Sequence, residues 1–158
     1  MKTVTRALVV RSVDYKDSDK ILTLLTPDMG KLSAGARGCR KKGSAIAAAC
    51  QLLCWSELVL SDRGGKWSVS EASTLREFLG VRRDLDKLAL ACYFAEMAEV
   101  LSVEGMPSPG LLSLTLNSLH ALECLDRPPE QIKAVFELKA MCLAGYEPLI
   151  EGCALCGE

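Results

Sequence analysis

Residues 3–39 read TVTRALVVRSVDYKDSDKILTLLTPDMGKLSAGARGC, and the architecture we expect for the chain starts from this stretch. It holds three segments rich in Val, Leu, Thr or Ala, a composition that favours strands, and polar turns separate them. The strands are expected at Thr3–Val13, Lys20–Thr26 and Lys31–Cys39, with turns at Asp14–Asp19 and Pro27–Gly30. The chain is therefore predicted to begin with three consecutive strands.

The residues that follow add a connection and two further strands. The small-residue run Ala45–Cys50 predicts a short connecting helix. Gln51–Ser61 resembles a long apolar strand, and a hairpin turn leads to Lys66–Ser70, which alternates apolar and polar side chains. Three strands, a short connection and two more strands is the order of a five-stranded oligonucleotide/oligosaccharide-binding (OB) barrel, although strand count also allows an SH3-like barrel.

From Arg82 the apolar residues recur about every 3.6 positions, which predicts helices. Leu85 opens the apolar stripe of the first helix, Ser108 is the expected N-cap of the second, and Gly145 is the expected C-cap of the third. The three helices are expected at Arg82–Val103, Pro109–Leu125 and Glu130–Ala144. The sequence thus predicts an α+β protein: an OB-fold domain over residues 1–80, a helical domain over 81–150 and the start of a cysteine knuckle at 151–158.

Charge is distributed unevenly along the 158 residues, whose net charge is −1. Residues 1–80 hold 13 Lys and Arg against 8 Asp and Glu, whereas residues 81–158 hold 6 against 12. Only the first half suits a polyanion. No signal peptide is visible, and the longest apolar run without charge, 14 residues from Gly43, is shorter than the roughly 20 that cross a membrane. A cytoplasmic protein without a membrane partner is expected.

The segment from residue 31 to residue 42 has the composition of a phosphate-binding surface. It carries five cations and no carboxylate, and its small residues allow a polyanion to approach the backbone. Tyr15, in a polar turn, is the best candidate to stack on a base, whereas Trp55 and Trp67 more often fill a core. A solvated loop is the alternative interpretation. The candidate nucleic-acid-binding residues are Lys31, Arg37, Arg40, Lys41, Lys42 and Tyr15.

Two of the eight cysteines, Cys153 and Cys156, form a Cys-x-x-Cys knuckle flanked by glycines. Two thiolates at this spacing are half of a four-cysteine zinc site, and the completing pair is expected beyond Glu158, in a longer chain. The surroundings lack the pattern of a thioredoxin-like redox site. The other six cysteines are expected to be small buried hydrophobic residues of a reducing compartment.

No catalytic motif is present in the sequence. Asp14, Asp17 and Asp19 lack the spacing of a calcium loop and are expected to form a turn. His120, the only histidine, lies in a leucine-rich helix and is expected to be packed or at the edge of the core. No enzyme activity is therefore expected.

Several of these segments together resemble the bacterial recombination mediator family RecO. The resemblance covers nearly the whole chain and rests on residues 7–15, 18–27, 30–34 and 36–38 in the first half and on residues 88–94, 136–139, 145–148 and 152–157 in the second. It implies an OB barrel, a helical domain and a zinc-binding insertion. By position, Lys31, Arg37 and Arg40 fall on the family's basic surface, Lys41 and Lys42 extend it, and Cys153 and Cys156 match the first zinc pair.

The resemblance also implies a function without catalysis. Such a protein binds single- and double-stranded DNA, anneals strands, and works with RecR to load RecA on DNA coated by single-strand binding protein, whose acidic C-terminal tail it recognises. Two other hypotheses remain. One is an adaptor whose helical domain binds protein partners without touching DNA, and the other, less favoured, is a metal-dependent enzyme using Asp14, Asp17 and Asp19.

Overall fold

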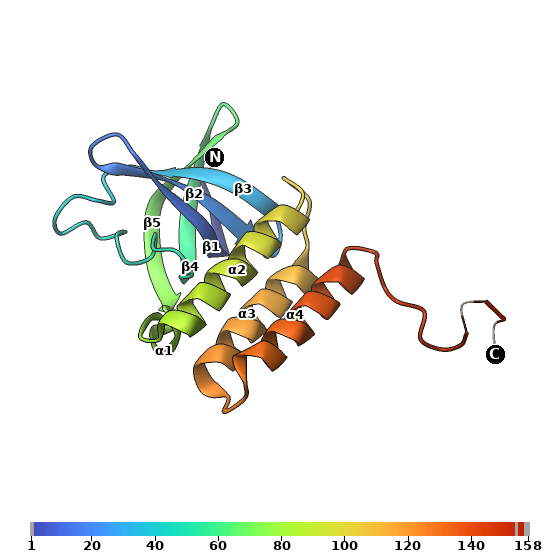
Figure 1. Cartoon of the computed structure of the whole chain (residues 1–158). Coiled ribbons are helices and arrows are strands. Elements are labelled where there is room, and N and C mark those ends of the chain that lie inside the picture. Colours follow the sequence, from blue (N-terminus) through green and yellow to red (C-terminus); the bar gives the residue numbers. More distant parts are fainter. Residues whose placement is uncertain (1, 154, 157–158) are drawn as a thin grey trace.

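The computed structural model describes residues 2–153, 155 and 156, and it shows a β-barrel beside a group of helices (Figure 1). Five strands close the barrel in the order β1-β2-β3-β5-β4. The predicted α+β fold, an OB-type barrel followed by helices, is confirmed. The strands are β1 Lys2–Tyr15, β2 Asp19–Thr26, β3 Gly30–Ala36, β4 Trp55–Arg63 and β5 Lys66–Arg76, and the helices are α1 Leu79–Arg82, α2 Leu85–Leu101, α3 Pro109–Cys124 and α4 Pro129–Leu143.

Strand β1 is long enough to pair with two neighbours. Its first half runs antiparallel to β4 as far as the pair Leu8↔Trp55, and its second half runs antiparallel to β2. The register shifts between Val9 and Arg11, near the point where β1 changes partner. A short parallel contact between β3 and β5 then closes the barrel.

Both faces of β1 are buried over Ala7, Leu8, Val9 and Val10. Ala7 and Val9 point into the barrel core, whereas Leu8 and Val10 join a second cluster formed with the helices. Alternate side chains of a strand point to opposite faces, so four consecutive buried residues require cover on both sides. The helices supply the cover on the outer side.

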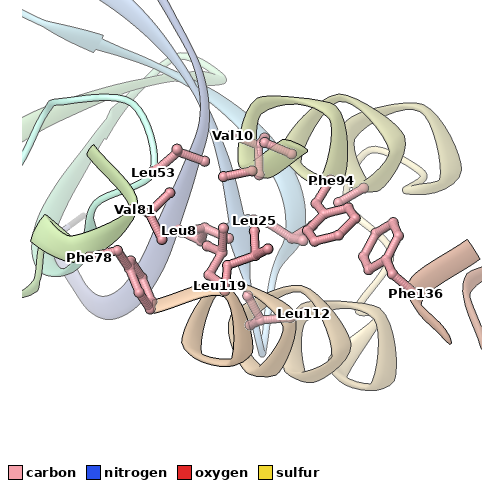
Figure 2. Close-up of a cluster of buried hydrophobic side chains, with 14 of the residues drawn as sticks. Leu8, Val10, Leu25, Leu53, Phe78, Val81, Phe94, Leu112, Leu119 and Phe136 are labelled. Atoms are coloured by element: carbon pink, nitrogen blue, oxygen red, sulfur yellow. The ribbon is translucent and has the colours of Figure 1, made fainter. Parts of the chain in front are cut away.

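The second cluster is a shared core, formed by barrel and helices together (Figure 2). Leu8, Val10 and Leu25 from the strands meet Phe94 of α2, and Phe136 of α4 stacks on Phe94 with ring centroids 4.2 Å apart. Burial of a Leu or Phe side chain contributes about 1.5–3 kcal/mol, so this cluster joins the two parts firmly.

The helix predicted at Ala45–Cys50 is absent, and the structure has a series of turns there instead. Cys50 belongs to the barrel core and Ala49 is buried beside it in the chain, and Val9 exchanges backbone hydrogen bonds with Leu53 and Cys54. Small side chains fit close against the strands, and these tertiary contacts override the intrinsic helical preference of the alanines. Burial raises the pKa of the Cys50 thiol to about 12, which agrees with a structural role.

Other boundaries also differ from the sequence prediction. β4 begins at Trp55 instead of residue 51, and β5 continues to Arg76, because the two strands pair along most of their length. Leu85 is 80% exposed, since the buried face of α2 is made by Phe94 and small alanines that allow close approach to β1. Cys124 is exposed, unlike the buried residue that we expected, whereas Cys39, Cys50 and Cys54 are buried as predicted.

The helix ends follow the predicted capping in part. Ser108 stands at the N-cap of α3 before Pro109, as predicted, but its side chain makes no capping hydrogen bond. Asp84, which the sequence analysis did not identify, caps α2 by accepting hydrogen bonds from the backbone N–H groups of Asp86 and Lys87. After α4, Gly145 has φ +93° and the N–H of Tyr146 donates to the carbonyl of Met141, which is a Schellman ending. In the described part of the chain no helix has the combination of length and apolar character needed to cross a membrane.

Candidate nucleic-acid interface

A groove crosses β2 and β3 between the β1–β2 turn and the β4–β5 hairpin. Its volume is about 1280 Å³, larger than the roughly 300–1,000 Å³ of most small-molecule pockets. In OB folds this face and these two loops bind oligonucleotides. The size and position of the groove therefore suit a polymeric ligand.

Cations outnumber carboxylates along the groove. Six basic side chains line it against three acidic ones, so an anionic chain would meet a positive surface. They come from both loops and from the two strands between them, which places charges on both walls and on the floor. The basic residues are Lys16, Lys20, Lys31, Arg37, Arg63 and Lys66, and the acidic residues are Asp19, Asp28 and Glu104.

The sequence-predicted binding residues fall into two groups. Tyr15, Lys31 and Arg37 line the groove. Arg40 lies on the loop between β3 and β4, where its guanidinium pairs with the Asp14 carboxylate at 3.3 Å and donates to the carbonyl of Lys16 at 3.3 Å. This charge is thus partly neutralised, against our expectation of a free phosphate contact.

Lys41 and Lys42 are exposed on the same loop and do not line the groove. Lys31 lines the groove, but its Nζ donates to the carbonyl of Glu99 near the end of α2 at 2.7 Å. The basic run in the sequence therefore does not form one continuous patch. It supplies two groove cations, Lys31 and Arg37, and a loop beside the groove that carries Arg40, Lys41 and Lys42, which we call the cationic loop.

Asp19 fixes the start of this cationic loop. Its carboxylate accepts a hydrogen bond from the backbone N–H of Gly38 at 2.8 Å and another from the hydroxyl of Ser18 at 3.3 Å. The Gly38 hydrogen bond is the main reason that the pKa of Asp19 lies below its usual value. The backbone N–H of Arg40 donates to the carbonyl of Ser18, so the loop is tied to the β1–β2 turn at two points.

Four cations of the groove were missed because no basic run marks them. Lys16 and Lys20 flank the β1–β2 turn, and Arg63 and Lys66 flank the glycine pair of the β4–β5 hairpin. A signal was available, since these two loops border the ligand face of an OB barrel. The positive charge of those two loops in the sequence would have indicated these four residues.

Two aromatic side chains reach the groove. Tyr15 is 47% exposed at the end of β1, with the ammonium of Lys16 5.3 Å from its ring centroid. Trp67 is half-buried, packs against the barrel core and also lines the groove, although the sequence favoured a core role alone. Trp55 packs against the shared core as expected. Tyr15 and Trp67 are thus the two aromatic candidates for stacking on a base in this groove.

A separate cluster on α3 brings His120, Glu123 and Cys124 together, with their ligand atoms within 4.8 Å of one another. The guanidinium of Arg76 lies among them: its Nη2 is 2.8 Å from both Glu123 Oε2 and His120 Nδ1. A fixed cation disfavours a metal ion at the same place. The cluster instead links β5 to α3, and the exposed His120 belongs to this link at the edge of the core.

Glu123 is the centre of that link. Burial tends to raise the pKa of its carboxyl, but hydrogen bonds from Arg76 and from the backbone N–H of Gly80 outweigh burial and hold the pKa below its usual value. The carboxylate therefore stays ionised and joins the barrel to the helices. Asp14 and Asp19 have structural partners as well. They lie at the end of β1 and the start of β2, so the predicted turn is present but is shorter, at residues 16–18.

Cys153 and Cys156 are exposed beyond α4. The Cys153 sulfur accepts the backbone N–H of Leu155 at 3.5 Å, and this contact contributes most to lowering the pKa of the thiol. Stabilised thiolates are the ligands that zinc requires, so the pair fits half of a zinc site. No third potential ligand joins them among the residues that the structure describes. Ala154, Gly157 and Glu158 of the predicted knuckle lie outside the described residues.

Comparison with known families matches both parts of the chain. The family model described as "Recombination protein O N terminal" matches residues 1–78, and the model described as "Recombination protein O C terminal" matches residues 82–158. The two matches together cover nearly the whole chain.

Curated relatives give the same result. A protein of Acetivibrio thermocellus named "DNA repair protein RecO" is 35% identical over 154 residues, which is 98% of this chain and 61% of the relative. A protein of the same name from Desulfitobacterium hafniense is 36% identical over 152 residues, covering 96% of this chain and 55% of the relative. One from Dehalococcoides mccartyi is 34% identical over 96% of this chain and 60% of the relative. The chain thus spans about three fifths of the length of these relatives.

Proposed function

The chain belongs to the recombination protein O family, and from this premise we propose that it acts in DNA repair by binding DNA in the groove over β2 and β3. The observation that carries the proposal is the groove itself, in which six basic side chains and two aromatic rings line one face of an OB-type barrel. Cations hold the sugar-phosphate backbone and release its counterions, whereas the rings stack on bases without selecting among them.

Single-stranded DNA is the ligand that this groove suits best. Tyr15 and Trp67 can stack only on bases that are free of a duplex. Double-stranded DNA would contact the cationic loop through Lys41 and Lys42, which are exposed beside the groove. A protein that holds single strands by their backbones leaves base edges free to pair, which is the physical requirement for annealing.

The partners implied by the family are part of the same proposal. The chain would bind a RecR-like protein and the acidic C-terminal tail of single-strand binding protein, and these contacts would help to load RecA. It would do so in the cytoplasm and without catalysing a reaction itself. Family membership supports these steps. Binding of purified RecR or of the tail peptide to the chain would test them directly.

Zinc is the cofactor that we propose for a longer chain. Cys153 and Cys156 would supply two of its four ligands, and a second pair would lie further along. The ion would stabilise the local fold there. Zinc content of the longer protein, compared with a variant in which both cysteines are replaced by serine, is the measurement that checks this.

A salt titration tests the DNA-binding proposal. Replacing Lys16, Arg37, Arg63 and Lys66 with alanine should weaken binding of a mixed-sequence single strand. The slope of log affinity against log salt should fall by about 2–3, because each phosphate contact contributes roughly 0.7. The matched control replaces four cations of the helical part, Arg83, Lys87, Arg127 and Lys139, and should keep the slope. If the slope of log affinity against log salt were unchanged in the groove variant, the groove would not be the DNA-binding site.

A second candidate function is an adaptor whose helices bind a protein partner. The exposed apolar side chains of α4, among them Val135, Leu138 and Leu143, favour it. Leu138→Asp should then abolish partner binding and leave the affinity for DNA unchanged. If Leu138→Asp still bound every partner of the wild type, the adaptor function would be contradicted.

A further inference from the structure

The two ends of the groove carry opposite charge. At the end of β3, the groove is lined by Lys16, Lys20 and Arg37, which we call the basic end. At the start of β3, it is lined by Asp28 of the β2–β3 turn and by Glu104 of the α2–α3 connection, which we call the acidic end. Arg63 and Lys66 of the β4–β5 hairpin lie between the two ends, since the next residue, Trp67, pairs with Ala34 of β3. An extended polyanion would therefore meet attraction along most of the groove and repulsion at the acidic end.

Each end also contains one residue of the opposite charge, and local hydrogen bonds hold that residue in place. Asp19 also lies near the basic end, but its carboxylate accepts hydrogen bonds from Gly38 and Ser18. Lys31 lies at the acidic end, but its ammonium donates to the carbonyl of Glu99. Among the described residues, neither Asp28 nor Glu104 forms an ion pair.

The position of Glu104 is fixed by the backbone. β5 pairs with β3 only at Ala34 and Gly35, so the edge of β3 near its start is open to another partner. The α2–α3 connection takes that place: Lys31 and Glu104 form a parallel bridge, and the N–H of Gly105 donates to the carbonyl of Lys31 at 3.0 Å. Figure 1 shows this connection, in yellow, beside the start of β3.

We propose that Asp28 and Glu104 form an electrostatic stop that keeps phosphates away from the start of β3. The bound strand then occupies the groove between the two loops and continues past the basic end toward the cationic loop. Through Glu104, the helical part of the chain limits the length of DNA that the barrel holds. This inference rests on the proposed function, because it concerns the same groove.

The test is the double variant D28N/E104Q, which removes both negative charges and keeps side-chain size. The backbone contacts of Glu104 do not depend on its carboxylate, so the variant should keep the melting temperature of the wild type. Binding is measured with oligothymidylates of increasing length across a range of salt. We expect tighter binding of long oligonucleotides, roughly twofold or more for each charge removed. The salt slope should rise by about 0.7 for each phosphate gained, and full affinity should require a longer oligonucleotide than in the wild type.

The matched control is E96Q/D126N, which makes the same change of net charge at two exposed residues outside the groove. If this control tightens binding as much as D28N/E104Q, net charge alone is responsible and the stop is refuted. If the wild type binds with a salt slope that D28N/E104Q does not change, the stop is refuted while DNA binding stands. If the wild type does not bind oligothymidylate, the proposed function and the stop both fail.

Discussion

The carboxylate of Asp19 is one of the contacts that hold the cationic loop where it leaves the barrel. The N–H of Gly38 donates to it at 2.8 Å, and Gly38 directly follows the groove residue Arg37. Because this hydrogen bond is made to the ionised form, it lowers the pKa of Asp19. A group with a depressed folded-state pKa contributes stability above its unfolded pKa and loses that contribution as the pH falls through the folded value. The loop should therefore stay attached at every pH where an ordinary aspartate is charged.

An NMR titration of the Gly38 amide tests this attachment. Its chemical shift should titrate with a midpoint below 3.8, the pKa of an ordinary aspartate, because the hydrogen bond from Gly38 favours the ionised form of Asp19. Asp19→Asn is the control, because the amide oxygen can still accept the hydrogen bond but carries no titrating charge. A midpoint at or above 3.8 would show that the Gly38 contact does not stabilise the carboxylate.

Among single residues, the sequence indicated only some of those that line the groove. Arg37 and Lys31 were found because they belong to a basic run, and Tyr15 because it lies in a polar turn. Trp67 was assigned to the core because it alternates with polar neighbours, yet a half-buried ring can fill the core with one edge and line the groove with another. The pairing of Arg40 with Asp14 joins the β3–β4 loop to the end of strand β1, and no local pattern reports such a contact.

Among the elements, the α2–α3 connection depends on a glycine in the barrel. Gly30 begins β3 with φ +66°, a conformation that favours glycine. A Cβ atom at this position would also overlap the backbone of Met106, including its carbonyl group. The connection can therefore lie against β3, with Glu104 at the groove, only while residue 30 has no side chain.

Gly30→Ala is expected to destabilise the protein by more than its backbone conformation explains. The matched control is Gly105→Ala, since Gly105 has φ +69° and an added Cβ would meet nothing within 4 Å. The control should cost about 1 kcal/mol for the left-handed conformation, and Gly30→Ala should cost at least about twice as much. Urea unfolding of both variants gives the two values. If both variants lost the same free energy of unfolding, the α2–α3 connection would be able to move away from residue 30 without a cost in stability.

Element boundaries were predicted well where a strand or helix follows its own periodicity. The turn at Pro27–Gly30 and the end of α4 at Gly145 have local causes, namely a proline, a glycine and positive φ. Ala45–Cys50 was predicted as a helix because alanine favours helices, but its buried members are held by the barrel. The bridge between Lys31 and Glu104 joins positions 73 residues apart, and residue spacing carries no signal for it.

In the whole molecule, the barrel and the helices share one core. Four consecutive apolar residues, Ala7 to Val10, were a usable signal that both faces of β1 are covered. What covers the outer face could not be predicted, because the position of α2 depends on its alanines and on the contacts of Phe94. The link from Arg76 to Glu123 adds a polar contact between the same two parts. The two parts should therefore unfold as a unit despite their different secondary structure.

Urea unfolding followed by two signals tests this cooperativity. Trp55 and Trp67 both lie in the barrel, so tryptophan fluorescence reports on the strands, whereas circular dichroism at 222 nm reports mainly on the helices. The two curves should coincide.

Phe136→Ala, which removes the ring stacked on Phe94, should lower the stability seen by both signals by about 3–4 kcal/mol. Its exposed neighbour Val135 gives the control variant Val135→Ala, which should leave both curves nearly unchanged. If Phe136→Ala shifted the helical signal alone, the shared core would not couple the parts, and Glu104 could not be held at the groove by the stability of the helices.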